Sequence, residues 1–377
     1  MNIFLRKKNE YTSGSLSREA WRKFLRNKLS LFALIYIILS AIVACLGYLI
    51  TPDSTPMANR QTLELSTKKP GFNIMMLKIL KEEDVPHKGI FHRMLFGERS
   101  KFQFLPIQSY NYKNGLLTIQ EYSGEDGVPG PERTFLLDQN QLKGQLILKR
   151  FLLGTDQFGR DILSRLMIGS RVSLAVGLIS VVISLLIGIT VGSLGGFFRG
   201  WIDQFVVWLI NVVWSIPTLL LVIAITFALG KGFWQVFIAV GFTMWVEVAR
   251  VTRGQILAIR EKEFVEAAKA LGFSNFRIIF RHILPNIMGP IIVISAANFA
   301  SAILIEAGLS FLGIGVQPPM PSWGSMIREN YAYLILNAAH LAILPGLAIM
   351  LTVLSFMVTG NGLRDALDVK KHETVQP

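Results

Sequence analysis

Six long apolar runs are the feature that most constrains the fold of this chain. They are residues 29–50, 172–192, 209–229, 233–249, 287–312 and 341–359. The chain has 377 residues, of which 51% are hydrophobic and only 17% are charged, and this composition is too apolar for an ordinary soluble domain. A helix of about 20 apolar residues is long enough to cross the ~30 Å hydrocarbon core of a bilayer. We therefore predict an all-α membrane protein with six transmembrane helices.

Basic residues are distributed unequally between the loops that join these runs. Nineteen lysines and arginines lie in the four segments 1–28, 193–208, 250–286 and 360–377. The short segments 230–232 and 313–340 contain only Lys231 and Arg328. Because short loops rich in Lys and Arg stay on the cytoplasmic side, both termini are expected in the cytoplasm. The net charge of +13 follows from this anchoring pattern, so no nucleic-acid partner is expected.

The segment 51–150 differs from the rest of the chain because it is polar and contains strand and turn signals. Asn114-Gly115 separates two strand-like runs, and Asn-Gly in that position is the strongest short signal of a hairpin. We expect a small, mostly β, extracytoplasmic insert after the first transmembrane helix at 29–50. Residues 1–28 are predicted to form a cytoplasmic tail and an elbow helix lying in the membrane interface.

The charged loop 250–286 has the pattern of two short helices. Three apolar residues share one face at helical spacing: Phe264, Ala268 and Leu271. Two acidic residues, Glu263 and Glu266, lie off that face. Gly272 suits the left-handed turn that ends a helix, and Ser274 is a residue type that caps the next one. The alternative interpretation is a solvated connecting loop.

Ionisable residues within or beside the apolar runs are costly in lipid and therefore informative. Glu247 and Arg250 close the fourth run, where they are expected to pair or to extend to the interface. Glu306, toward the outer end of the fifth run, either lines a polar cavity or bonds to a neighbouring helix. The segment 153–165 contains two aspartates and two arginines. We interpret it as a turn held by local ion pairs, the alternative being a carboxylate site.

Sequence motifs of catalysis and of nucleotide binding are absent. The chain has no Gly-x4-Gly-Lys-[Ser/Thr] phosphate loop, no Gly-x-Ser-x-Gly, no His-Glu-x-x-His and no Cys-x-x-Cys. Cys45 is the single cysteine, and the five histidines are scattered without metal-ligand spacing. We therefore expect no enzymatic activity, no metal site and no cofactor in this chain, and energy for any transport must come from another protein.

Several motifs resemble those of one transporter family. Glu266-Ala-Ala268, followed by Gly272 and by His-Ile-Leu-Pro at 282–285, resembles the EAA loop of bacterial ABC-importer permeases. The segments Gly-Thr-Asp-x-x-Gly-Arg-Asp at 154–161 and Glu-Ala-Gly-Leu-Ser-Phe-Leu-Gly at 306–313 resemble the dipeptide/oligopeptide and nickel branch, in its second permease type.

The resemblance covers residues 151–370 closely and implies a fold and a location. The fold is that of a type I ABC-importer permease (MetI-like), with a transmembrane domain at 151–370, a cytoplasmic coupling loop at 250–286 and a tail at 371–377. The location is the bacterial cytoplasmic (inner) membrane.

The resemblance also implies partners and roles for residues. The partners are a homologous permease that completes a heterodimer, two cytoplasmic ATPases that bind ATP and Mg, and an extracytoplasmic substrate-binding protein. The residues that would dock on an ATPase are Glu263, Phe264, Glu266, Ala267, Ala268, Leu271 and Gly272. Glu306 and Ser310 would line the translocation pathway. Pro318, Pro319 and Trp323 would contact the binding protein.

The function implied is ATP-driven import of di- or oligopeptides by alternating access. An ion-coupled secondary transporter that acts alone is the alternative. It would need ionisable relay residues near the middle of the membrane or an internal repeat, and neither is found beyond Glu306.

Overall fold

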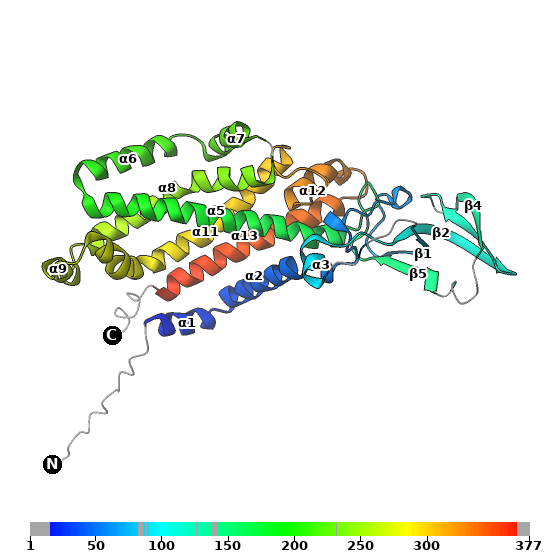
Figure 1. The fold of residues 1–377 in the computed structure, drawn as a ribbon, viewed down its shortest axis with the longest axis horizontal. Helices are drawn as coiled ribbons and strands as arrows, with labels where there is room; N and C mark the ends of the chain where they lie inside the picture. The colour runs from blue at the N-terminus through cyan, green and yellow to red at the C-terminus, as the bar shows by residue number, and fades with distance from the viewer. Residues whose placement is uncertain are drawn as a thin grey trace, which may run out of the picture.

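The structure is a computed structural model that describes residues 16–81, 86, 89–125, 127–136, 142, 144–230 and 232–367. It consists of a bundle of long helices and a sheet at one end of that bundle (Figure 1). Figure 1 places α1 (Leu16–Arg26), α9 (Glu263–Ala270) and the last turn of α13 at the end opposite the sheet. The predicted tail 371–377 and Lys231 lie outside the described residues.

The bundle has five described helices that are long and apolar enough to cross a membrane, and a sixth crossing if one bent pair is counted as a span. The long helices are α2 (Lys28–Leu46), α5 (Ile162–Phe198), α8 (Phe233–Ile259), α11 (Leu284–Phe311) and α13 (His340–Leu367). The bent pair is α6 (Gly200–Trp214) and α7 (Thr218–Leu229), and shorter helices are α3 (Ile90–Phe96), α10 (Asn275–Arg277) and α12 (Trp323–Asn330). The predicted number of spans therefore agrees with the bent pair counted as one.

The third span differs from the prediction of one uninterrupted helix at 209–229. The chain leaves the helical path between Trp214 and Thr218, and α6 and α7 are bent by 89° at this break. Pro217 explains the break, because its ring removes a backbone donor and disfavours the helical conformation of the residue before it. The prediction of a continuous helix is wrong here.

Helices α5 and α8 pack closely through glycines of α5 that are spaced by four residues. A Cβ atom at Gly188 would lie 2.5 Å from the Cβ of Val248, and one at Gly192 would lie 2.5 Å from the carbonyl oxygen of Ala249. Small residues at this spacing let two helix backbones approach, so Gly188 and Gly192 permit the close packing of α5 against α8.

The insert is a five-stranded antiparallel sheet in the order β4-β3-β2-β1-β5. Its strands are β1 (Phe72–Leu80), β2 (Phe102–Lys113), β3 (Leu116–Tyr122), β4 (Pro129–Leu136) and β5 (Leu146–Phe151). Asn114 and Gly115, with φ of 51° and 81°, form the predicted hairpin turn between β2 and β3. Strand β1 contributes Ile74 and Met76 to one buried cluster and Leu77 to another, so the mostly β insert is confirmed.

Arg171 of α5 ties the first span to the rest of the bundle. Its guanidinium donates hydrogen bonds to the carbonyls of Ala44 and Cys45 at the end of α2, and to those of Met94 and Leu95 in α3. The last carbonyls of a helix have no intrahelical donor. One side chain therefore satisfies them and fixes α2 against α5.

The α5–α8 contact predicts a difference between two glycine variants. Gly192→Ala would press a methyl group against the backbone of Ala249 and should lower the free energy of unfolding by about 1–3 kcal/mol. Gly346→Ala, inside α13 with open space around it, should leave stability unchanged or raise it. Thermal unfolding in detergent measures both, and equal unfolding temperatures would contradict this account of the contact.

Candidate functional site

The inner side of α9 packs onto its own chain. Val265 is fully buried and Ala268 is 4% exposed. They join a cluster formed by three long helices at the end of the bundle opposite the sheet: Phe197, Ile256, Ile259, Ile278, Ile279, Ile283, Ile287 and Ile291. Burying this apolar surface stabilises the short helix in a fixed position. The prediction that Ala268 contacts a partner is corrected, because this residue attaches α9 to the bundle.

The outer side of α9 is free in the subunit. Glu263, Phe264, Glu266 and Ala267 are exposed, and so are Leu271 and Gly272 just beyond the helix. Phe264 is 40% exposed and Leu271 is 73% exposed. We call Glu263, Phe264, Glu266, Ala267 and Leu271 the α9 outer face. The structure thus divides the predicted apolar face, since Phe264 and Leu271 point away from the core that holds Ala268.

The turn after α9 leads directly into the fifth span. Gly272 has φ of 75°, a left-handed conformation that suits glycine. The Ser274 hydroxyl then accepts a hydrogen bond of 3.4 Å from the N–H of Arg277, as predicted for a cap. The helix continues through a π-helical segment, Ile278–Ile283, in which the N–H of Leu284 bonds to the carbonyl of Ile279. This wider turn accommodates Pro285, which has no N–H to donate.

Charged and aromatic contacts fix the loop to the inner end of α5. Glu261 pairs with Arg199, and the guanidinium of Arg260 donates to the carbonyl of Phe197. The ammonium of Lys269 lies 5.7 Å from the centre of the Phe197 ring, within the range of a cation–π contact. The loop is therefore a structured elbow, and the alternative of a purely solvated connection is not what the structure shows.

At the opposite end of the bundle, the segment 154–161 forms a buried ionic cluster. Arg160 pairs with Asp156 at 2.5 Å and with Glu329 of α12 at 2.6 Å. Arg165 lies 3.6 Å from Asp156 and 3.3 Å from Glu329. All four side chains are at most 15% exposed. The prediction of a turn held by ion pairs is confirmed, and we call Asp156, Arg160, Arg165 and Glu329 the outer ionic cluster.

Asp161 begins α5 at the edge of this cluster. Its carboxylate accepts a hydrogen bond of 2.9 Å from the N–H of Ser164, the arrangement of an N-cap. Burial raises the pKa of Asp161, while its hydrogen bonds with Ser164 oppose that rise. The carboxylate therefore has a structural role in starting the helix.

Glu306 and Ser310 lie inside the subunit. Glu306 has no exposed surface and Ser310 is 1% exposed. The Ser310 hydroxyl donates to Glu306 at 2.7 Å, and the hydroxyl of Ser173 on α5 donates at 3.4 Å. Of the two alternatives for Glu306, the bond to a neighbouring helix is correct. The prediction that Glu306 and Ser310 line the pathway is wrong, because their polar atoms join α11 to α5.

The proline-rich segment before α12 combines exposed prolines with a buried tryptophan. Pro318 and Pro319 are exposed and joined by a cis peptide bond, so a partner can reach them. Trp323 is 3% exposed, and its indole N–H donates to the carbonyl of Leu166 at 3.0 Å. The prediction that Trp323 contacts a binding protein is corrected, because this side chain belongs to the core between α5, α12 and α13.

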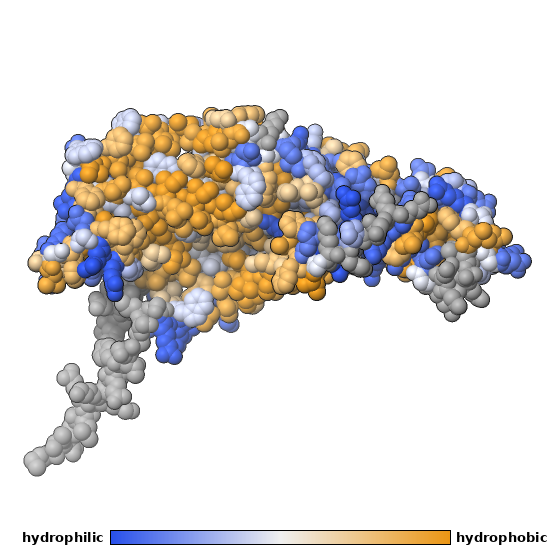
Figure 2. All heavy atoms as spheres, viewed as in Figure 1, coloured by the Kyte–Doolittle hydropathy of each residue, from blue (hydrophilic) through white to orange (hydrophobic). Residues whose placement is uncertain are grey.

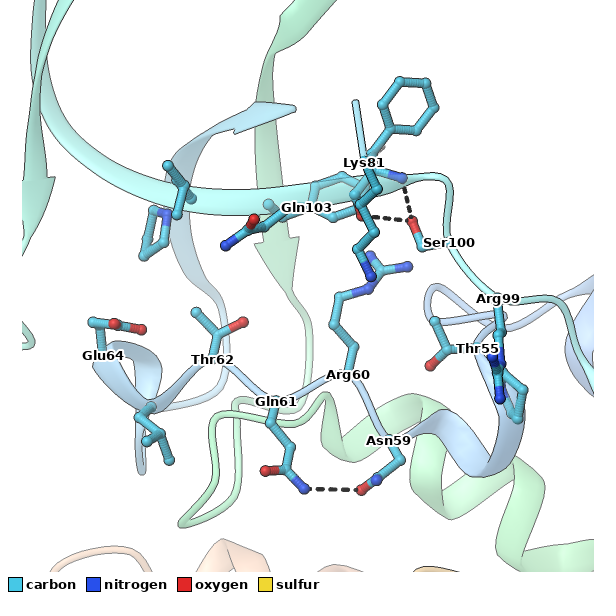
Figure 3. A pocket seen from close by; sticks show the side chains of 16 residues that line it. Thr55, Asn59, Arg60, Gln61, Thr62, Glu64, Lys81, Arg99, Ser100 and Gln103 are labelled. Carbon is cyan, nitrogen blue, oxygen red and sulfur yellow. Dashed lines mark hydrogen bonds between the residues drawn. The ribbon is translucent and has the colours of Figure 1, made fainter. Parts of the chain in front are cut away.

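A groove of about 690 Å³ lies at the base of the insert. Figure 3 shows the side chains of Arg60 and Lys81 pointing toward one another across it, with Gln103 beside them. The guanidinium of Arg60 lies 4.3 Å from the centre of the Phe104 ring and 3.4 Å from Asp53. Lys81 and Arg99 are exposed. This groove, which we call the insert groove, is lined by three basic residues and one acidic residue, Glu64, so its lining has a net positive charge.

The profile of the binding-protein-dependent transport system inner membrane component family matches residues 184–372. This match covers half of the chain and includes α9 with the ends of the helices that hold it. The chain belongs to this family of transport permeases. A second profile, for the N-terminal transmembrane domain of oligopeptide transport permease C, matches residues 15–66. The permease therefore has a MetI-like bundle, and its sheet lies between the two matched ranges.

Curated relatives agree with this membership. The glutathione transport system permease protein GsiD of Pectobacterium atrosepticum is 43% identical over 58% of the permease and 72% of the relative. The dipeptide transport system permease protein DppC of Alkalihalophilus pseudofirmus is 44% identical over 58% of the permease and 71% of the relative. Among solved structures, a chain of the inward-facing MetNI methionine ABC transporter is similar, with 19% identity over 54% of the permease and 95% of that chain, at a TM-score of 0.45.

Two features of the permease escaped the sequence analysis. The first is Val265, which stands one residue after Phe264 and anchors α9. Helical spacing alone does not say which side of a helix faces the core, so its burial was not predicted. Glu329 completes the outer ionic cluster from more than 160 residues away in the chain, and no local pattern signals such a partner.

Replacing one charged residue of the outer ionic cluster by an uncharged one should strongly lower the stability of the permease. Asp156→Asn would leave Arg160 and Arg165 buried with one carboxylate between them, and should lower the free energy of unfolding by about 3–5 kcal/mol. Arg93→Ala removes a more exposed pair with Glu98 and should cost at most about 1 kcal/mol. Thermal unfolding of the permease in detergent compares them, and similar losses from both variants would contradict a structural role for the cluster.

Proposed function

We propose that this permease is one half of a heterodimeric pathway in an ATP-driven importer of di- or oligopeptides. A homologous permease would form the other half, two cytoplasmic ATPases would bind ATP and Mg and drive the cycle, and an extracytoplasmic binding protein would deliver the peptide. The names of the relatives, which are permeases for dipeptide and glutathione transport, support this substrate class.

The observation that carries the proposal is the division of α9 into a buried inner side and an exposed outer face. Val265 and Ala268 fix the helix to the subunit, while Phe264 and Leu271 leave apolar surface uncovered beside Glu263 and Glu266. Exposed apolar groups rimmed by charges are typical of a protein interface. In the proposed complex this face docks on an ATPase, and basic groups there pair with the two glutamates.

Movement of α9 would pass directly to the membrane spans. The helix lies between the inner ends of α8 and the helical stretch that leads into α11, which runs without a break from Asn275 to Phe311. Closure of the ATPase dimer would displace α9 sideways and tilt these spans together. Such rigid-body rocking of packed helices is a known form of conformational switching and would open the pathway to each side in turn.

The sign of the loop charges sets the proposed orientation. The loop between α8 and α11 and both termini would face the cytoplasm, and the sheet would face the outside of the bacterial inner membrane, since basic residues favour the cytoplasmic side. The binding protein would then approach Pro318, Pro319 and the insert groove from the outside.

The α9 outer face gives the first test. Phe264→Ser with Leu271→Ser removes exposed apolar contacts and leaves Val265 and Ala268 in place, so the helix should stay folded. Truncating two central apolar contacts should weaken ATPase association by at least about tenfold. Co-purification with the ATPases and ATP-dependent peptide uptake in proteoliposomes measure the loss.

The matched control for that variant is Leu148→Ser, which changes an equally exposed leucine (71%) on β5. It should leave ATPase association unchanged. Full uptake by the double variant, or uptake by the permease without any ATPase as an ion-coupled transporter would show, would refute the proposed function.

The insert groove gives the second test. Lys81→Glu with Arg99→Glu reverses two exposed charges and should weaken association with an acidic surface of the binding protein, by slowing encounter at low salt. Surface plasmon resonance on the detergent-purified complex at two salt concentrations measures the association rate. An unchanged rate, or a loss that does not depend on salt, would show that the groove takes no part in delivery.

A further inference from the structure

A cavity of about 220 Å³ opens where the third span breaks. It is lined by residues of α6, α7, α8 and α11, among them Trp214, Thr218, Thr243, Glu247 and Ser301. Non-helical backbone at membrane depth is tolerated only where protein buries it or where it borders a water-filled cavity. The cavity lies beside the break between Trp214 and Thr218. Together they form one polar opening in the bundle.

Glu247 places a carboxylate in this opening. It follows fourteen residues of α8 and precedes twelve, so in a helix about 40 Å long it lies about 20 Å from each end. A ~30 Å hydrocarbon core that lies wholly along α8 includes this position, which stands toward the end of the apolar run 233–249. Figure 2 shows that hydrophobic residues cover most of the visible face of the helical bundle. A carboxylate at such depth is expensive unless it faces water or a cation.

Glu247 has no cationic partner within the part of the chain that the structure describes. A pair with Arg250 was one expectation for Glu247, but the guanidinium of Arg250 lies 3.6 Å from the centre of the Trp214 ring, and the two residues form no ion pair. Glu247 is exposed on the subunit surface. The carboxylate is thus available to a cation that enters the cavity.

The neighbouring hydroxyls fit a primary ammonium group. Thr243 donates its hydroxyl proton to the carbonyl of Val240, which leaves its oxygen as an acceptor, and Ser301 lines the same cavity from α11. An ammonium has three donors and no acceptor. A carboxylate with hydroxyl oxygens beside it matches that pattern, and the volume holds several waters or the first residue of a peptide.

We propose that Glu247 is a recognition subsite on the translocation pathway that binds the N-terminal ammonium of a peptide as it crosses the membrane. The proposal rests on the function proposed above and adds a chemical requirement for the cargo. The carboxylate replaces the hydration that the ammonium loses at membrane depth, and Thr243 and Ser301 supply further acceptors.

The test compares two peptides in proteoliposomes that contain the complete importer. Trialanine carries the ammonium, and propanoyl-Ala-Ala lacks only that group. Uptake rates are measured at peptide concentrations that saturate the binding protein, so that its own selectivity does not enter. Glu247→Gln should slow trialanine uptake by at least about tenfold, the effect of losing a charge-assisted hydrogen bond, and should leave propanoyl-Ala-Ala uptake within twofold.

Two further variants keep the result interpretable. Glu247→Asp retains the charge and should keep most of the trialanine uptake, and Glu19→Gln on α1, a carboxylate remote from the cavity, should behave as the wild type. ATP hydrolysis stimulated by the loaded binding protein should persist in Glu247→Gln, which shows that the complex is assembled and coupled.

Three outcomes would overturn the subsite. They are unchanged trialanine uptake by Glu247→Gln, an equal loss for both peptides, and failure of that variant to assemble, which would mean that Glu247 pairs with a basic residue of the second permease. Absence of ATP-dependent uptake of either peptide by the wild-type importer would instead refute the proposed function, so the two failures are distinguishable.

Discussion

The close contact between α5 and α8 is the interaction on which the rest of the bundle depends. In lipid, apolar side chains gain little by leaving hydrocarbon for one another, so helices associate through packing of small residues. Gly188 and Gly192 provide that contact with the backbone of α8. Because both helices continue beyond it, their inner ends supply Phe197 and Ile256 to the cluster that holds α9. The position of the loop 250–286 thus depends on glycines that precede Phe197 by about one and a half and two and a half helical turns.

The outer end of α5 shows how an added sheet is joined to a bundle of this family. Gly159 has φ of 69°, and a Cβ there would lie 1.7 Å from the carbonyl oxygen of Thr62. The turn that holds Asp156 and Arg160 therefore lies directly against the segment leading into β1. The sheet falls between the two ranges that match family profiles. The turn that follows β5 contains this glycine, and the outer ionic cluster links the same turn to α5 and α12.

The sequence predicted features governed by local pattern and missed those governed by distant partners. The six apolar runs, the Asn114-Gly115 hairpin and the Ser274 cap depend on a few neighbouring residues, and each appears in the structure. Glu306 and Trp323 were assigned to surfaces although they are buried, because their partners Ser173 and Leu166 lie on another helix. Periodicity identifies an apolar face of a short helix, but it does not say whether that face meets its own chain or another.

Whether an apolar face meets its own chain or another matters most for α9, because the proposed coupling needs one side of this helix to pack on the spans and the other to bind a partner. If α9 only docked on an ATPase, its movement would not reach the membrane spans. If α9 only packed on the spans, it would offer no exposed surface for an ATPase to bind. Val265 and Ala268 meet the second need and leave Phe264 and Leu271 for the first. The π-helical segment before Pro285 keeps the chain helical past a residue that has no N–H to donate, so the helical stretch continues from Asn275 to Phe311. The proposed coupling therefore requires both the divided helix and the unbroken path behind it.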